Sequence, residues 1–184
     1  MTDITAPSPG RRRTAPTPAA GNGAATGRAP DPRLVALVEL LFFAYRDFTG
    51  EADAILAEIG FGRAHHRVLH FVNRNPGLRV ADLLGILKIT KQSLARVLKQ
   101  LVDEGYVVQS AGERDRRERR LTLTDKGSAL ARRLVTLQAQ RIAKALSVVG
   151  PDADPAVQQF LFAMIGSQDR SEVAALVGIR ELAV

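Results

Sequence analysis

Five arginines lie within seven residues near the middle of the chain, where they could bind an anion. They are Arg114, Arg116, Arg117, Arg119 and Arg120, and acidic residues at 113, 115 and 118 are interleaved with them. β-Prone runs flank the cluster, at 106–109 and at 121–123. The pattern predicts a two-stranded ribbon with cations at its tip, which suits contact with nucleic-acid phosphates or a narrow minor groove. A solvated face is the alternative interpretation.

A helix with a polar front end precedes this ribbon. Residues 89–105 read ITKQSLARVLKQLVDEG, with Thr90 as the expected N-cap and Gly105 as the expected left-handed C-terminal residue. The spacing directs one set of side chains inward: Leu94, Val97, Leu98, Leu101 and Val102. It leaves another set facing outward: Lys91, Gln92, Ser93, Arg96 and Lys99. A helix followed by a basic ribbon is the element order of a winged helix-turn-helix.

Charge and composition limit the possible functions. The formal net charge is +7, and residues 61–126 carry 14 Lys/Arg against 7 Asp/Glu, so this middle segment is expected to face a polyanion such as double-stranded DNA. There is no cysteine, which excludes disulfides and thiolate metal sites. We find no apolar run of the roughly 18–20 residues that a membrane span needs and no hydrophobic signal core in residues 1–30. We therefore expect no membrane partner and a cytoplasmic, nucleoid-associated protein.

The remaining segments predict a mainly helical chain. Residues 1–30, rich in Pro and Gly and containing Arg11–Arg13, are expected to form a disordered basic tail. A helix is expected to start near Asp31-Pro32 and to reach about residue 59. Its part from 34 to 48 is apolar on nearly every side, so it needs a partner surface; the residues expected there are Leu34, Leu37, Leu41, Phe42 and Tyr45. Further helices are expected at 62–73, 80–87, 124–149, 156–165 and 172–182.

Residues 83–127 resemble the MarR family of bacterial winged-helix regulators. The specific element runs from Asp115 to Gly127, DRRERRLTLTDKG, which is similar to the family's Asp-x-Arg wing tip followed by a strand ending in Leu-Thr-x-x-Gly. The run from Gly62 to Gly77 is similar to the PetP-type subgroup. The resemblance implies a fold that is mainly α with a small β-hairpin wing. It places the winged helix-turn-helix at about 61–126 and dimerisation helices at about 32–59 and 125–182, within one domain at 31–184.

The resemblance also implies a function and a set of contacts. The expected protein is a homodimer that binds a palindromic operator and is controlled by a small-molecule effector. The helix at 89–105 would enter the major groove, with Lys91, Gln92, Ser93 and Arg96 as base readers. Arg116 is assigned to the arginine of Asp-x-Arg and would enter the minor groove, and Asp115 would orient the wing. Three further cations are expected either to contact phosphates or to be solvated: Arg114, Arg117 and Arg119.

Three histidines suggest a second site. His66 and His70 are four residues apart on a predicted helix, so they share a face that could hold a metal or haem, although no third ligand is evident. The resemblance favours another role, in which His65, His66, His70 and Tyr45 line an effector pocket, and we expect no cofactor. No phosphate loop, nucleophile elbow or paired carboxylates indicate an enzyme. A sequence-tolerant architectural DNA-binding protein and a metal- or haem-responsive regulator stay open as alternatives.

Overall fold

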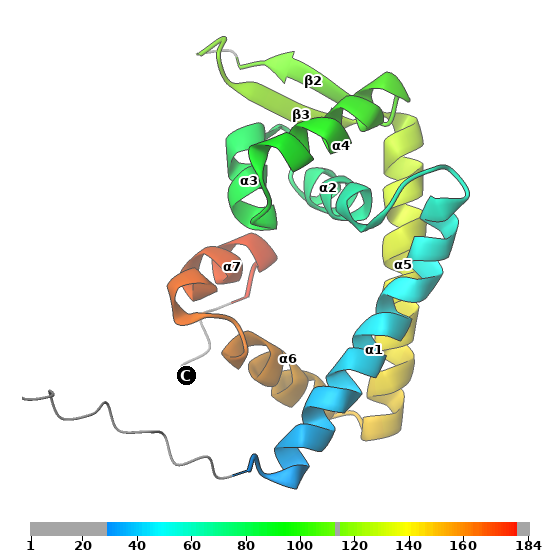
Figure 1. Cartoon of the computed structure of the whole chain (residues 1–184), viewed down its shortest axis with the longest axis vertical. Helices are drawn as coiled ribbons and strands as arrows, with labels where there is room; N and C mark the ends of the chain where they lie inside the picture. Colours follow the sequence, from blue (N-terminus) through cyan, green and yellow to red (C-terminus); the bar gives the residue numbers. More distant parts are fainter. Residues whose placement is uncertain (1–28, 113–114, 180–184) are drawn as a thin grey trace, which may run out of the picture. The chain divides into compact units, whose positions relative to one another are not determined.

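The computed structural model describes residues 29–112 and 115–179 (Figure 1). The chain divides into two units, one that ends at Glu39 and one that begins at Leu40. The described elements, in chain order, are α1 (Pro32–Ala57), α2 (Arg63–Arg74), β1 (Leu78–Arg79), α3 (Val80–Leu87), α4 (Lys91–Asp103), β2 (Val107–Ala111), β3 (Arg119–Leu123), α5 (Asp125–Val149), α6 (Ala153–Ala163), a short 3₁₀ helix (Ser167–Asp169) and α7 (Arg170–Val177). The mainly helical fold class is confirmed. The predicted tail lies outside the described residues except for its last two positions.

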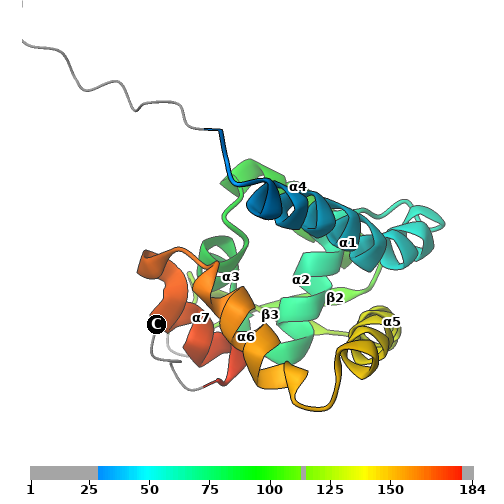
Figure 2. The same cartoon turned by 90° about the horizontal axis from the view of Figure 1, so that it is seen from below.

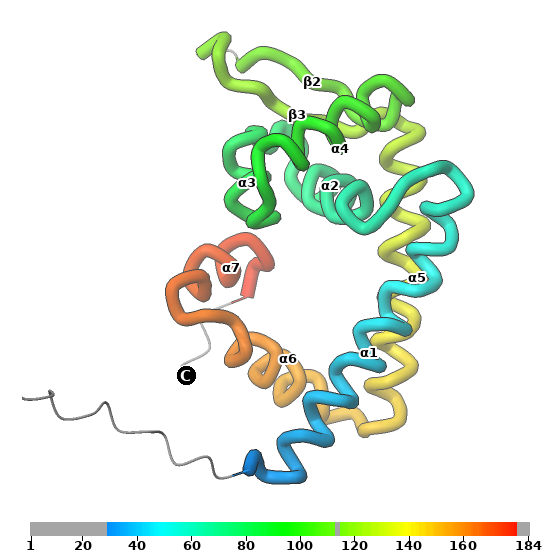
Figure 3. Tube along the Cα trace, viewed as in Figure 1, coloured from blue at the N-terminus to red at the C-terminus, as the bar shows by residue number. Residues whose placement is uncertain are grey.

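Helices α3 and α4 are joined by a three-residue turn. Lys88, the residue after the end of α3, adopts the left-handed conformation (φ 50°, ψ 45°), and its backbone N–H donates to the Leu84 carbonyl. Thr90 then caps α4, because its side chain accepts a hydrogen bond from the Ser93 backbone N–H at 3.1 Å. The trace in Figure 3 shows how short this connection is. The sequence predicted both helices and the cap from local patterns alone.

The sheet has three strands, one more than the predicted ribbon. Its order is β1-β3-β2, with both pairings antiparallel. β2 pairs with β3 so that Gln109 faces Leu121, and β1 adds Leu78 against Leu121 on the other side. The predicted two-stranded ribbon is confirmed as β2 and β3. The sequence did not predict β1, because a two-residue strand has no alternation to detect and forms only when the chain returns to it.

One core cluster joins α2, α3, α4, α5 and the C-terminal part of α1 to the sheet. Helix α2 contacts α4, α5 and β3, and Figure 2 shows it from a second side. The fully buried side chains come from α1, α2, α3, α4, β2, β3 and α5, and include Leu56, Val68, Leu69, Leu83, Leu101, Leu121 and Leu134. The prediction that Val102 packs inward was wrong. Its side chain is 37% exposed, because it lies on the side of α4 that lines an open pocket with Lys99 and Gln109, whereas the neighbouring Leu101 is fully buried.

The start of α5 approaches the backbone of Tyr106 very closely. Thr124 caps the helix by accepting from the Gly127 backbone N–H at 3.1 Å, and its hydroxyl donates to the Gly105 carbonyl at 2.8 Å. A Cβ on Gly127 would lie 2.1 Å from the Tyr106 carbonyl oxygen. The Leu-Thr-x-x-Gly element is therefore explained by packing: threonine caps the helix, and glycine leaves room for the neighbouring strand.

The C-terminal helices are shifted from their predicted positions. α6 begins at Ala153, three residues before the predicted start, so that Pro155 lies in its first turn, where a missing N–H is tolerated. α7 ends at Val177, and residues 180–182 of its predicted range lie outside the described residues. None of the described helices is both long and apolar enough to cross a membrane.

Candidate nucleic-acid interface

The N-terminal half of α4 presents polar side chains to solvent. Lys91, Gln92, Ser93 and Arg96 are all exposed, while Leu94 and Val97 anchor the opposite side of the helix in the core. Within the described residues, no hydrogen bond or ion pair occupies the side chains of Lys91, Gln92 or Arg96. Ser93 differs, because its hydroxyl accepts from the Thr90 hydroxyl at 2.9 Å as part of the cap. Lys99, one turn further on, is paired with Asp103.

Asp115 organises the described part of the wing tip. Its carboxylate Oδ1 accepts from the Arg117 backbone N–H at 2.8 Å, and its carbonyl accepts from the Glu118 backbone N–H at 3.0 Å. The turn is tight, since a Cβ on Gly112 would lie 2.7 Å from the Asp115 carbonyl oxygen. The wing-orienting role expected of Asp115 therefore has a geometric basis in these backbone hydrogen bonds. Arg114 lies outside the described residues.

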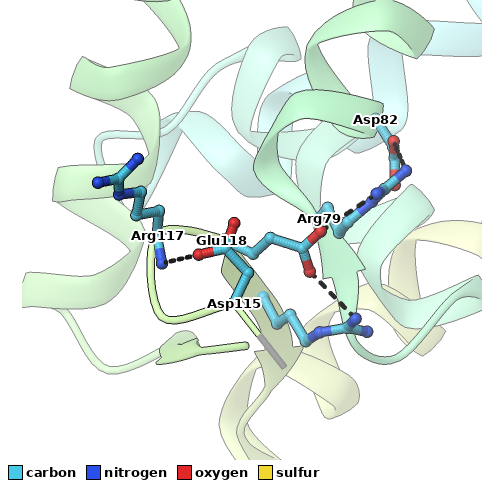
Figure 4. Close-up of polar contacts among 6 residues, drawn as sticks. Arg79, Asp82, Asp115, Arg117 and Glu118 are labelled. Atoms are coloured by element: carbon cyan, nitrogen blue, oxygen red, sulfur yellow. Dashed lines mark hydrogen bonds and ion pairs between the residues drawn. The ribbon is translucent and has the colours of Figure 1, made fainter. Parts of the chain in front are cut away.

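The spacing at the wing tip corrects one assignment. Counted from Asp115, the arginine of an Asp-x-Arg element is Arg117, and Arg116 is its middle residue. The assignment of Arg116 to the motif arginine was therefore wrong. Arg116 and Arg117 are both exposed, and the Arg117 side chain points away from the Glu118 carboxylate (Figure 4).

A network of ion pairs ties the wing to the start of α3. The Arg79 guanidinium contacts Asp82 at 2.6 Å and Glu118 at 3.3 Å, and Glu118 also accepts from Arg120 at 3.2 Å (Figure 4). The hydrogen bond to Asp82, which has the larger effect, and the hydrogen bond to Glu118 raise the pKa of Arg79 above its ordinary value. Arg120 is thus compensated within the chain. Arg116, Arg117 and Arg119 have no ion pair within the described residues and are left for an outside anion.

A cavity of about 310 Å³ lies beside α2. Its lining combines aromatic, cationic and neutral polar side chains: Tyr45, Phe48, Thr49, Arg63, His66, Arg67, His70, Phe71 and Gln138. Burial lowers the pKa of His66 and of His70, and the neighbouring charges of His70 and Arg74 lower them further. Both imidazoles are therefore held toward the neutral form. Three of the four residues expected in an effector pocket, Tyr45, His66 and His70, meet in this cavity.

His65 lies outside that cavity and makes a different set of contacts. Its ring stacks on Phe61 with centroids 4.6 Å apart and planes 3° from parallel. Nδ1 accepts from the Gly62 backbone N–H at 3.1 Å, so the ring proton is assigned to Nε2, which lies 2.9 Å from Gln100 Oε1. His65 consequently joins the start of α2 to the middle of α4.

Known proteins are similar to this chain over the region that contains α4 and part of the wing. Residues 59–118 match the family model described as the MarR family. The chain is 48% identical over 135 residues to the HTH-type transcriptional regulator PetP of Rhodobacter capsulatus, an alignment that covers 73% of this chain and 81% of that protein. The chain belongs to the MarR family. It is a MarR-type transcriptional regulator similar to PetP, with the winged-helix fold of that family.

Other known proteins are similar to this chain in sequence or in fold. The HTH-type transcriptional repressor Rv2887 of Mycobacterium tuberculosis is 34% identical over 83 residues, which cover 45% of this chain and 60% of that protein. A crystal structure of Staphylococcus aureus MepR in DNA-binding conformation superposes with a TM-score of 0.61 at 16% identity, covering 70% of this chain and 95% of MepR. The transcriptional regulator SlyA gives a TM-score of 0.61 at 18% identity, covering 77% of this chain and 98% of SlyA.

Several residues of this MarR-family chain were not singled out from the sequence. Arg67 and Phe71 line the cavity, and their place one position beyond His66 and His70 on the same helix was an available signal. The sequence contained no such signal for Gln138 or Arg79, because the residues that they contact are distant in the sequence. Among the residues that the structure describes, no group of three or more His, Cys, Asp or Glu side chains could hold a metal ion. The metal-responsive alternative has no candidate site within those residues.

Proposed function

We propose that the chain is a homodimeric, sequence-specific DNA-binding repressor that binds a palindromic operator and responds to a small-molecule effector. The observation that carries the proposal is the presence of two exposed surfaces whose side chains form no ion pair or hydrogen bond within the described residues. One consists of Lys91, Gln92 and Arg96 on α4, and the other of Arg116, Arg117 and Arg119 on the wing. These side chains can form contacts with DNA without first breaking a hydrogen bond or an ion pair within the described residues.

In this proposal α4 enters the major groove. A glutamine can pair with adenine through two hydrogen bonds, and an arginine or lysine can pair with guanine, so Gln92, Arg96 and Lys91 are chemically suited to read base edges. Ser93 is the weaker candidate, since its hydroxyl already participates in the cap of α4. The wing would lie along the adjacent minor groove, with Arg117 or Arg116 in the groove and the other cations on phosphates.

Single substitutions on the wing test this arrangement. Arg117→Ala is expected to weaken binding to operator and to a scrambled duplex alike, with a larger loss when the adjacent minor groove is A·T-rich and narrow. Arg116→Ala is the matched comparison, one residue away and equally exposed. If neither substitution changes the affinity for either duplex, the wing does not reach the DNA.

A dimer is proposed because α1 leaves large apolar side chains in solvent. Leu41 is 42% exposed, Phe42 is 69% exposed and Tyr45 is 53% exposed, and Leu34 and Leu37 are also exposed earlier in the helix. Helix α6 and the residue after it add Phe160, Leu161 and Met164. Exposed large apolar side chains in such number favour a protein interface. A second copy would bury it.

An effector site is proposed in the cavity beside α2. Aromatic rings of Tyr45, Phe48 and Phe71 would contact an apolar or planar group, and Arg63 and Arg67 would attract a negative charge. The lining contains no Asp or Glu, and the two histidines are held toward the neutral form by burial. The lining therefore favours a small aromatic molecule with an anionic group.

Selection of bound duplexes separates this function from an architectural one. The purified protein is offered a pool of genomic fragments, the retained DNA is sequenced, and the best fragment is footprinted. The proposal predicts one recurrent palindrome with a short, sharply bounded footprint. An architectural protein would instead retain fragments of unrelated sequence and protect them broadly.

A further inference from the structure

We propose that Arg67 couples the cavity beside α2 to the turn that precedes α4, so that an anion in the cavity loosens the position of α4. The inference rests on the proposed effector site and names the residue through which it acts. Arg67 is the lining residue that also holds the end of α3: its Nη2 donates to the Leu87 carbonyl oxygen at 3.0 Å.

This hydrogen bond holds the backbone at Leu87, which lies directly before the turn that leads into α4. Leu87 is the last residue of α3, so its carbonyl has no partner within the helix, and a cation at a helix C-terminus is stabilising there. The next residue, Lys88, is held in the left-handed conformation, and α4 begins only three residues later. The Arg67 guanidinium therefore bonds to the backbone immediately before the turn that sets the start of α4.

Arg63 is a natural comparison in the same cavity. Its Nε is paired with the Asp53 carboxylate at 2.7 Å, so its charge is already compensated. Arg67 has only a neutral carbonyl as its described partner. A carboxylate would add the attraction between opposite charges to the hydrogen bond that Arg67 donates, and the neutral Leu87 carbonyl cannot supply that attraction. A carboxylate that enters the cavity would therefore compete for Arg67 more effectively than for Arg63.

Loss of the Arg67–Leu87 hydrogen bond would remove one of the polar links from α2 to the helix-turn-helix. The link from His65 to Gln100 would stay, so α4 would be loosened at its N-terminal end, where Gln92 and Arg96 lie. Operator affinity would fall. By thermodynamic linkage, bound operator would lower the affinity for the anion by the same factor.

The experiment uses sodium benzoate as the probe, because it combines one aromatic ring with one carboxylate. Three proteins are compared: the full chain, Arg67→Met and the control Arg74→Met. Arg74 is on the same helix and is exposed, but it does not line the cavity. Amide hydrogen exchange at Lys88 and Leu94 is measured without DNA, benzoate affinity by calorimetry, and operator affinity with and without saturating benzoate.

Benzoate is expected to accelerate exchange at Lys88 and Leu94 in the full chain and to weaken operator binding about tenfold, within the usual range of coupling between sites. Arg67→Met is expected to exchange fast without benzoate, to bind operator about tenfold more weakly and to show no further response. Arg67→Lys, which keeps a cationic donor, is expected to restore slow exchange in part. Arg74→Met is expected to behave like the full chain.

Two results would overturn the inference. One is Arg67→Met with slow exchange and an unchanged response to benzoate, which would mean that Arg67 does not hold the turn. The other is absence of benzoate binding to the full chain, which would reject an anion-binding cavity. Failure of the proposed DNA function would look different, because the full chain would then bind no operator even without benzoate.

Discussion

Nε2 of His65 lies 2.9 Å from Oε1 of Gln100, and this contact connects the first turn of α2 to the middle of α4. The other ring nitrogen of His65 accepts from the Gly62 backbone N–H, so the imidazole is fixed at both ends. Gln100 extends the link, since its amide nitrogen contacts Glu104 Oε1 at 2.9 Å. His65 thus links α2 to α4, whereas the family resemblance had placed it in an effector pocket.

His65→Phe tests this link, because a phenyl ring keeps the stacking on Phe61 and removes both hydrogen bonds. Each net hydrogen bond contributes about 0.5–1.5 kcal/mol, so the free energy of unfolding should fall by about 1–3 kcal/mol. A double-mutant cycle with Gln100→Met, followed by urea denaturation, isolates the interaction between the two side chains. Strictly additive losses would show that His65 and Gln100 do not interact.

Stability should decrease as the pH falls through the histidine range. Burial lowers the pKa of His66 and His70 in the folded chain below their unfolded value of about 6.5. The unfolded state therefore takes up protons first, and stability falls from about pH 6.5 down to the lower folded pKa values. Melting temperatures at several pH values, for the wild type and for His66→Gln with His70→Gln, measure the effect. An unchanged pH slope in the double variant would contradict it.

Gly127→Ala should destabilise the fold at the junction of the wing and α5. The added Cβ would meet the Tyr106 carbonyl at 2.1 Å, and relieving such a clash typically costs about 1–3 kcal/mol of unfolding free energy. Gly85→Ala in α3 is the matched control, since its Cβ would meet nothing within 4 Å. That change should stabilise by about 0.5–1 kcal/mol, because alanine favours a helix. Equal effects of the two substitutions in thermal denaturation would count against this packing.

Phe42→Glu should convert the proposed dimer into a monomer. The side chain is 69% exposed in the single chain, and a charge there would be buried without a partner in a dimer. Light scattering at micromolar concentration measures the mass. The control is Val108→Glu on β2, a comparably exposed apolar residue away from α1 that should leave the mass unchanged. A wild-type mass of one chain would reject the dimer itself.

Local patterns predicted the helix-turn-helix closely, and long-range contacts account for what they missed. Thr90 and Gly105 occupy the cap and the turn that the sequence assigned to them, because capping depends on residues only a few positions away. The strand β1 and the contact from Arg67 to Leu87 depend on how distant segments meet, so no sequence period reveals them. Val102 followed the helical period but lies on the side of α4 that lines an open pocket.

The features of the candidate DNA-binding surface also divide into those that local patterns predicted and those that depend on long-range contacts. Exposure of Lys91, Gln92 and Arg96 followed from the helical spacing of their apolar neighbours. The ion pair between Glu118 and Arg79 was not predictable, because it needs the third strand to bring Arg79 beside the wing. The sequence assigned different roles to the wing arginines, and the structure shows in addition that Arg120 is paired with Glu118.

The affinity ratio between the selected operator and a scrambled duplex of equal length, for the wild type and for Gln92→Ala, tests the central claim most directly. Specific regulators bind their sites about 10³–10⁷-fold more tightly than other DNA, and we predict a ratio in that range for the wild type. If Gln92 reads a base edge, its loss should cost about 1–3 kcal/mol on the operator and nothing on the scrambled duplex. A wild-type ratio near one would contradict a sequence-specific regulator.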